Sequence, residues 1–121
     1  MIAVTLPYPV SANSYWRHSG KFVYVSKRAL EYRKSVAAIC YAYGAKMMEG
    51  KVALFVELCP KARKVDTGKP IRVIDLDNCL KVMCDALQGI AFTNDSQIQA
   101  ISAKYGDPVP GGALNIKVVQ A

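Results

Sequence analysis

The chain has 121 residues, of which 52% are hydrophobic, so it can form one domain with a buried core and is not a disordered polymer. It carries 16 Lys+Arg against 9 Asp+Glu, and the formal net charge of +7 favours a polyanionic partner, either nucleic acid or an anionic membrane surface. The longest largely apolar run without charges, residues 35–45, is shorter than the about 20 residues that span a bilayer. No signal-peptide pattern follows Met1, so we expect a cytoplasmic protein without a membrane partner.

Four cysteines are scattered along the chain: Cys40, Cys59, Cys79 and Cys84. No Cys-x-x-Cys pair is present, and the one histidine, His18, is distant from them in sequence. A structural zinc site needs four such ligands at closer paired spacing. We therefore expect reduced, mostly buried thiols and no zinc centre.

The first strand is predicted at residues 2–6, where apolar side chains alternate. Residues 7–18 follow as an irregular segment that contains two prolines and many aromatic and hydrogen-bonding side chains. Two interpretations of this segment are open. It either caps the core, with Tyr15 and Trp16 tucked in, or faces a ligand, since Asn, Tyr and Arg side chains can reach phosphates and bases.

A short strand is predicted at residues 21–25, and Ser26 is a plausible N-cap for a long helix that runs to about Met48, with Gly50 as its stop. The apolar stripe of this helix is formed by Ala29, Tyr32, Val36, Ile39, Cys40, Tyr43 and Met47. The helix is decorated by Lys27, Arg28, Arg33, Lys34 and Lys46. A charged helix face is usually just solvated, but a basic face also suits contact with DNA.

Residues 52–59 predict a buried strand, and residues 60–70 predict a polar loop. The basic side chains of the loop and of the segment after it are Lys61, Arg63, Lys64, Lys69 and Arg72. A basic loop beside an acidic cluster suits a phosphodiester substrate, because one group can bind the flanking phosphates while the other holds a metal at the scissile phosphate.

A second helix is expected from Asp77 to about Gly89, and two further strands at residues 97–105 and 113–119. The chain shows no internal repeat and no domain boundary. The predicted fold is therefore a single mixed α/β (α+β) domain over residues 1–121, with two main helices packed on a mixed sheet in the order β-α-β-α-β-β.

The segment 71–88 combines acids and a lysine with a helical apolar pattern. The apolar side chains at helical spacing are Leu76, Leu80, Met83, Cys84 and Leu87. Asp77, Lys81 and Asp85 recur every fourth residue on another face. Asp75 does not fit that face, because two residues along a helix are a rotation of roughly 200°. Asp75 and Asp77 can converge only if Asp75 is still extended, so we predict a strand end that runs into a helix, with Asp77 near the N-cap.

A metal site is the sharper interpretation of these acids. Asp95 ends a turn from which a strand could bring it to Asp75 and Asp77. Three carboxylates together would raise one another's pKa values unless a cation lies between them, and Mg²⁺ favours such hard oxygen ligands. Lys81, one turn after Asp77, could donate to the phosphate or to the transition-state oxygens.

Each of these residues also has a plainer interpretation. Asp77 could be an N-cap, Lys81 could form an i,i+4 ion pair, and Asp95 could be an ordinary turn residue. Asn78, a poor helix former beside two acids, is a candidate to orient a carboxylate or to contact DNA.

The motif Asp75-Leu-Asp-Asn-Cys-Leu-Lys81, followed by Asp85-Ala-Leu and Asn94-Asp95-Ser-Gln-Ile, resembles the RusA-type Holliday junction resolvases of bacteria and their phages. The opening of the family is also similar to segments of this chain, which are Pro7-Tyr-Pro-Val-Ser-Ala-Asn13-Ser-Tyr15-Trp16-Arg17, Tyr24-Val-Ser26 and Tyr32-Arg33. The resemblance covers most of the chain, and the D-x-D-N-x-x-K match is its most specific part.

The resemblance implies a small homodimeric endonuclease of a bacterial or phage-infected cell that nicks two opposing strands of four-way junction DNA. It implies Mg²⁺ as cofactor, which Mn²⁺ can replace, and no organic cofactor. Asp75, Asp77 and Asp95 would hold the metal, and Lys81 would serve catalysis. The candidate DNA contacts, taken from the basic segments and the resemblance together, are Asn13, Tyr15, Arg17, Lys27, Arg28, Lys61, Arg63, Lys64, Lys69, Arg72 and Asn78.

Some positions depart from the family pattern. Val10 replaces a usual proline, Cys79 replaces an aliphatic residue, and Asn94 stands where a further acid often precedes the metal-binding one. The approach to the motif, residues 64–74, is also longer than usual. Two alternatives stay open: a non-enzymatic module that binds branched DNA, with the acids as caps and ion-pair partners, and a nuclease that acts mainly on forks or flaps.

Overall fold

The computed structural model describes residues 1–62 and 73–121. In chain order the elements are β1 (Ile2–Leu6), α1 (Ala12–Tyr15), β2 (Trp16–Ser19), β3 (Phe22–Val25), α2 (Lys27–Ala42), β4 (Val52–Cys59), α3 (Leu76–Leu87), the 3-10 helix η1 (Asp95–Gln97), β5 (Ile98–Tyr105) and β6 (Ala113–Gln120). The expected mixed α/β class is confirmed, with α1, β2 and η1 added to the expected order.

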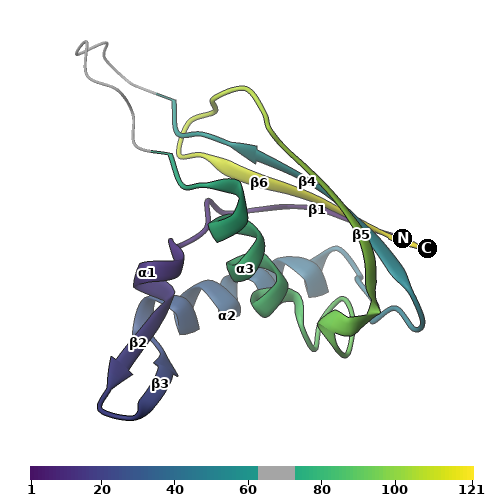
Figure 1. Cartoon of the computed structure of the whole chain (residues 1–121). Coiled ribbons are helices and arrows are strands. Elements are labelled where there is room, and N and C mark those ends of the chain that lie inside the picture. Colours follow the sequence, from purple (N-terminus) through teal and green to yellow (C-terminus); the bar gives the residue numbers. More distant parts are fainter. Residues whose placement is uncertain (63–72) are drawn as a thin grey trace.

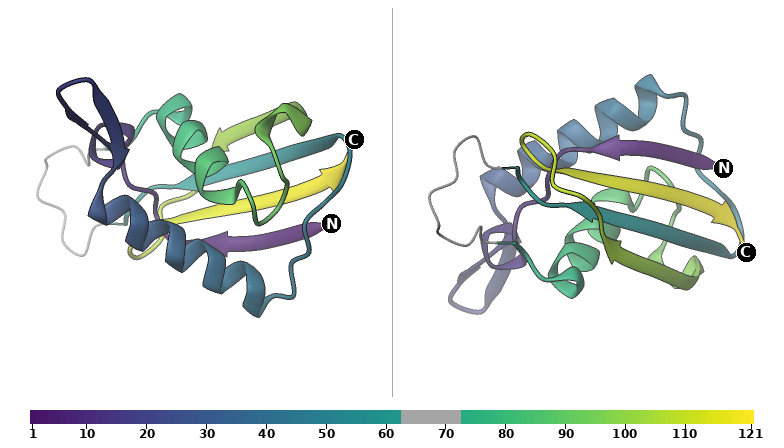
Figure 2. Two further views of the ribbon diagram at one scale, coloured as in Figure 1. Left: turned by 90° about the horizontal axis from the view of Figure 1, so that it is seen from below. Right: turned by 90° about the horizontal axis from the view of Figure 1, so that it is seen from above.

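Four strands form the main sheet in the order β1-β6-β4-β5. β6 pairs antiparallel with β1 and β4, whereas β4 and β5 run parallel, which makes the sheet mixed. Helices α2 and α3 both lie on one face of this sheet, and the two chain termini lie together at the end of the sheet far from α1 (Figure 1, Figure 2). The sheet and the two helices thus form two layers around one core.

The core follows from alternation in the strands and from helical periodicity in α2 and α3. In β1 every second side chain is buried, and β4 and β6 show the same alternation over most of their length. The buried side chains of α2 are Ala29, Tyr32, Val36 and Cys40, as expected, and Ile39 is partly buried. Tyr43 and Met47, predicted in the same stripe, lie past the last residue of the helix and are exposed. The buried side chains of α3 are Cys79, Val82, Met83, Ala86 and Leu87, a stripe rotated from the predicted one. The expected Leu76, Leu80 and Cys84 are only partly buried, at its rim.

Helix α2 ends at Ala42, and the prediction that it continues to about Met48 is wrong. Gly44 adopts a φ of 72°, and its N–H donates to Tyr41 O at 3.0 Å. The N–H of Ala45 donates to Cys40 O at 2.9 Å, which completes a Schellman motif. The apolar stripe continues past residue 42, but this motif satisfies the last helical carbonyls and turns the chain away.

Residues 16–25 form a hairpin of β2 and β3, of which the sequence predicted only the second strand. Gly20, with a φ of 59°, lies in the two-residue turn between Ser19 and Phe22, where a positive φ suits the twist of the paired strands. All four cysteines are free, as expected. Within the two described ranges, no helix is long and apolar enough to cross a membrane.

Ser26 is the N-cap of α2, as predicted, and its hydroxyl makes two hydrogen bonds. It accepts from Ala29 N at 3.2 Å and donates to Ser14 O at 2.6 Å, while the side chain is buried. Replacing Ser26 by Ala removes both bonds, so we expect a loss of about 1–2 kcal/mol in the free energy of unfolding, measured by urea denaturation. Ser35→Ala, at an exposed site of the same helix, is the matched control and should change stability by less than about 0.5 kcal/mol.

Candidate active site

Two acids lie at the start of α3. Asp75 is the N-cap residue, with an extended backbone (φ −66°, ψ 149°), and Asp77 lies in the first helical turn. The helix therefore begins one residue earlier than predicted, but Asp75 is outside it, as the argument from geometry required. The carboxylate of Asp75 makes no capping hydrogen bond, and both acidic side chains are exposed. Both carboxylates are thus open to solvent at the positive end of the helix dipole.

Lys81 and Asp95 line one surface groove. The groove has a volume of about 410 Å³, and its walls are formed by Trp16, Leu80, Lys81, Cys84, Asp85, Gln88 and Asp95. Lys81 comes from α3, one turn beyond Asp77, and Asp95 comes from the turn before β5. The fold therefore brings together two of the predicted catalytic residues that are distant in sequence.

The turn that carries Asp95 is held by a capping box. Asn94 accepts from Ser96 N at 2.9 Å, and the Gln97 side chain accepts from Asn94 N at 3.1 Å. Gln97 also donates to the carbonyls of Met48 and Gly50. Asn94 thus has a structural role at the start of η1.

Asp95 also acts electrostatically on α3. Burial, with the negative charge of Asp95 as a second cause, raises the pKa of the Cys84 thiol to about 11. Cys84 lines the same groove, one turn before Gln88. The Cys84 thiol therefore stays protonated near neutral pH. The carboxylate of Asp95 lies close enough to α3 to interact electrostatically with this side chain.

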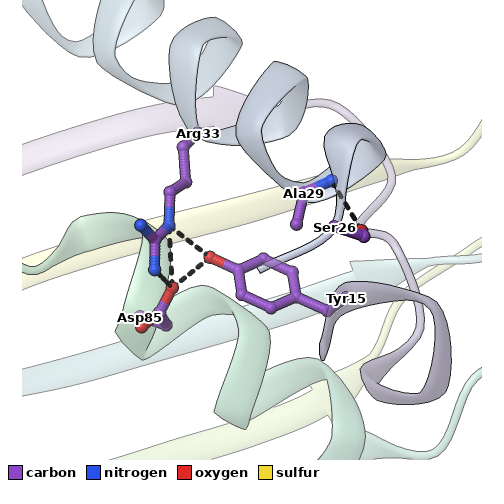
Figure 3. A network of polar contacts seen from close by, with 5 residues as sticks. All are labelled: Tyr15, Ser26, Ala29, Arg33 and Asp85. Carbon is purple, nitrogen blue, oxygen red and sulfur yellow. Dashed lines mark hydrogen bonds and ion pairs between the residues drawn. The ribbon is translucent and has the colours of Figure 1, made fainter. Parts of the chain in front are cut away.

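The third acid of α3, Asp85, belongs to a polar network with Tyr15 and Arg33 (Figure 3). Arg33 Nε donates to Asp85 Oδ2 at 2.9 Å and to the Tyr15 hydroxyl at 2.7 Å. The Arg33 guanidinium also forms an ion pair with Asp85, and the Tyr15 hydroxyl donates to the same carboxylate. The network joins α1, α2 and α3, because each helix contributes one of its members.

Tyr15 is fully buried, so the prediction that it contacts DNA is wrong. Burial, reinforced by the hydrogen bond to Asp85, raises the pKa of its phenol to about 12. The hydroxyl therefore remains a donor inside the network, in agreement with the interpretation of residues 7–18 as a cap over the core. Trp16 is only partly buried and lines the groove instead.

The three predicted metal ligands do not form a closed cage. Within residues 1–62 and 73–121, no group of three or more His, Cys, Asp or Glu side chains lies close enough to hold a metal ion. The chemistry of the donors still fits Mg²⁺, which is bound by one or two carboxylates and keeps several waters. The ligand set of Asp75, Asp77 and Asp95 stays a prediction.

The ion pairs of the described part of the chain are Arg33–Asp85 and Lys104–Glu57, the latter at 3.5 Å. Lys81 is in neither pair, although Asp77 and Asp85 lie one turn away on either side. The interpretation of Lys81 as an i,i+4 ion-pair partner therefore finds no support among these residues.

The predicted DNA contacts are distributed over several elements. Among the described residues, the exposed ones are Asn13 on α1, Arg17 on β2, Lys27 and Arg28 in the first turn of α2, and Lys61 after β4. Asn78 on α3 is half-buried. The Lys61 ammonium lies 5.3 Å from the centre of the Tyr8 ring, a cation–π contact. Arg63, Lys64, Lys69 and Arg72 lie outside the described residues.

Comparison with known proteins places the chain among the endodeoxyribonucleases. The family model described as Endodeoxyribonuclease RusA matches residues 7–118. The chain is 34% identical over 116 residues to the crossover junction endodeoxyribonuclease rusA of Enterobacteria phage HK97, which covers 95% of this chain and 91% of the relative. It is 30% identical over 120 residues to the protein of that name from Escherichia coli O139:H28, covering 98% and 93%. The chain belongs to the RusA family, and a nuclease family of this kind implies a divalent metal.

The network predicts a measurable effect of Arg33 on stability. Arg33→Gln leaves Asp85 without its charged partner, and we expect a loss of about 1–2 kcal/mol in the free energy of unfolding. The effect is reduced by solvent, because the two side chains are 37% and 30% exposed. Lys34→Gln, one residue along the same helix and exposed, is the control and should stay within about 0.5 kcal/mol of wild type in the same denaturation experiment.

Because the pKa of Tyr15 is raised, we predict that the free energy of unfolding decreases at high pH. Its pKa is raised from the ordinary value of 10.0 to about 12 in the folded protein, so it stabilises the fold fully below pH 10 and progressively less between pH 10 and 12. Tyr15→Phe should be less stable at neutral pH but should lose less stability over this interval. The measurement is urea denaturation at steps from pH 8 to 12, with Tyr41→Phe on α2 as an exposed control. Parallel curves for Tyr15→Phe and wild type would contradict the assignment.

Proposed function

We propose that this chain is a Mg²⁺-dependent endodeoxyribonuclease that resolves Holliday junctions by symmetric paired nicks, in DNA recombination and repair. The observation that carries the proposal is the groove at α3, where Lys81 and Asp95 meet beside a helix start that exposes Asp75 and Asp77. Membership of the RusA family and the net charge of +7 support a DNA substrate.

In this proposal Asp75, Asp77 and Asp95 hold the metal, for which Mn²⁺ can substitute. When bound, Mg²⁺ supplies an activated water and neutralises charge on the phosphate. The protein's own contribution comes from Lys81, whose ammonium is exposed in the groove and can donate to a phosphate oxygen as negative charge develops there. The positive end of the α3 dipole lies at Asp75 and Asp77, one turn before Lys81, and favours an anionic group at that end of the helix.

The exposed basic and amide side chains then bind the DNA around this site. Arg17, Lys27 and Arg28 are exposed on β2 and at the start of α2, where they can contact phosphates. Asn13 on α1, Lys61 after β4 and Asn78 on α3 are further contacts in this proposal. Each copy of the chain supplies one candidate set of catalytic acids, so two symmetric cuts require a homodimer. The protein would act in the cytoplasm of a bacterial or phage-infected cell, without an organic cofactor.

Cleavage of synthetic DNA tests the proposal. Purified protein is mixed with a four-way junction, a flap, a fork and a linear duplex in the presence of Mg²⁺ or Mn²⁺. We expect paired nicks in the junction, and a reduction of about 100-fold or more for Asp77→Asn and for Lys81→Met with junction binding retained. Asp107→Asn, an exposed acid in the turn before β6, is the control and should cleave like wild type.

Two other outcomes of this cleavage experiment would favour the two alternative functions. Wild-type protein that binds junctions but never cuts them with any divalent metal would contradict the nuclease and favour a non-enzymatic binding module, an alternative suggested by the open arrangement of the three acids. Faster cutting of flaps or forks than of four-way junctions would keep the chemistry and replace the substrate.

A further inference from the structure

The β2–β3 hairpin projects from the body of the protein (Figure 1, Figure 2). Its second strand exposes two aromatic side chains. Phe22 is 76% exposed, Val23 61% and Tyr24 52%. A two-stranded hairpin of this length is marginally stable by itself, and exposing large apolar side chains gives it no further stability. The exposed rings therefore point to a binding role rather than to a structural one.

The hairpin is fixed at its base, and the residues at its tip are exposed. Ser26 N donates to Tyr15 O at 2.8 Å, which closes the base immediately before β2 and after β3. Both of these residues are buried, Tyr15 in the network with Arg33 and Ser26 at the N-cap of α2. The exposed rings of Phe22 and Tyr24 are thus presented on a support that is anchored in the core.

One face of the hairpin alternates aromatic and polar side chains. Arg17 pairs with Tyr24, and Ser19 pairs with Phe22, so these four side chains share a face. Lys21 lies in the turn, and residues 16–25 contain no acid. A guanidinium beside exposed rings on a basic segment is the arrangement on which nucleic-acid bases stack.

The hairpin also adjoins the candidate active site. Trp16, the first residue of β2, lines the groove together with Lys81 and Asp95. Lys27 and Arg28 follow directly after the hairpin at the start of α2 and are exposed. Trp16 pairs with Val25 on the face opposite to Arg17 and Tyr24, so it is the base of the hairpin, and not its aromatic face, that forms part of the groove wall. The aromatic face thus projects from a base that lies beside the place where a phosphate would be cut.

We propose that the Arg17, Ser19, Phe22 and Tyr24 face of the hairpin binds the bases of branched DNA at the branch point, where stacking is interrupted. This inference rests on the proposed function and adds a base-binding element to it. Phe22 has no hydrogen-bonding group, so its contribution is stacking on a base, while Arg17 can pair with the adjacent phosphate. The basic charge and the absence of acids favour DNA over a second copy of this equally basic chain.

The experiment compares junction and duplex binding of the intact chain. Phe22→Ala/Tyr24→Ala is made in an Asp77→Asn background, and binding is measured to a four-way junction with 2-aminopurine at the branch point and to a linear duplex of equal length. We expect junction affinity to fall about 10- to 100-fold and the fluorescence change to be lost, while duplex affinity changes less than about threefold. Phe22→Tyr retains a ring and should bind like the parent, and Val23→Ala on the opposite face is the matched control.

Three results separate this inference from the proposed function. Unchanged junction affinity and fluorescence in the double variant would overturn the hairpin inference alone, provided that the wild-type protein cleaves junctions. Loss of ring-dependent binding together with a wild type that cuts no branched DNA would support the hairpin and overturn the nuclease. The third result comes from light scattering, which measures the oligomeric state of each variant. If the double variant is no longer a dimer but its junction affinity per dimer is unchanged, the hairpin is a contact between two copies of the chain, and the inference is overturned.

Discussion

The ion pair between Arg33 and Asp85, together with the Tyr15 hydroxyl that bonds to both side chains, is the interaction on which the arrangement of the helices depends (Figure 3). It joins α1, α2 and α3, whose members are separated by 18 to 70 positions in the chain. Apolar packing alone would let α3 slide or rotate on the sheet, since hydrophobic burial is not directional. Directional hydrogen bonds to one carboxylate fix the rotation of α3, and with it the direction in which Lys81 leaves the helix.

The same anchor serves the hairpin, because Tyr15 ends α1 and β2 begins at the next residue. Tyr15 therefore has two structural tasks: its side chain completes the network, and its carbonyl closes the hairpin base by accepting from Ser26 N. The groove and the exposed rings of the hairpin both depend on this residue, although it is fully buried. A DNA-contact role would need an accessible side chain, which explains why its place in a ligand-rich sequence segment was misleading.

Predictions from the sequence were correct for features that depend on local periodicity. They failed for features that depend on contacts between segments distant in the chain. Alternation and helical spacing located the main strands and both long helices, and the spacing of Asp75 and Asp77 correctly required an extended residue before α3. The end of α2 was predicted too late because the apolar pattern of the helix continues beyond Gly44. The positive φ of Gly44, which ends the helix, is visible only in the structure. The contact of Arg33 with Asp85 spans 52 positions, and the groove between α3 and the turn at Asp95 needs the tertiary fold. Neither can be obtained from spacing.

The acids at and near α3 fall into two groups: one makes contacts that stabilise the fold, and the others make few or none. Asp85 is held by Arg33 and Tyr15 and contributes to the fold. Asp77 gains something from the helix dipole, but Asp75 makes no capping hydrogen bond, although a capping side chain is worth about 1 kcal/mol at its position. Lys81, exposed between Asp77 and Asp85, is in neither ion pair of the described ranges. Lys81 lines the groove with Asp95, and Asp75 and Asp77 are exposed at the helix start one turn before Lys81. This arrangement supports the proposal that these side chains bind a phosphate and its cation, because a phosphate with its cation carries the charges that the lysine and the acids would bind.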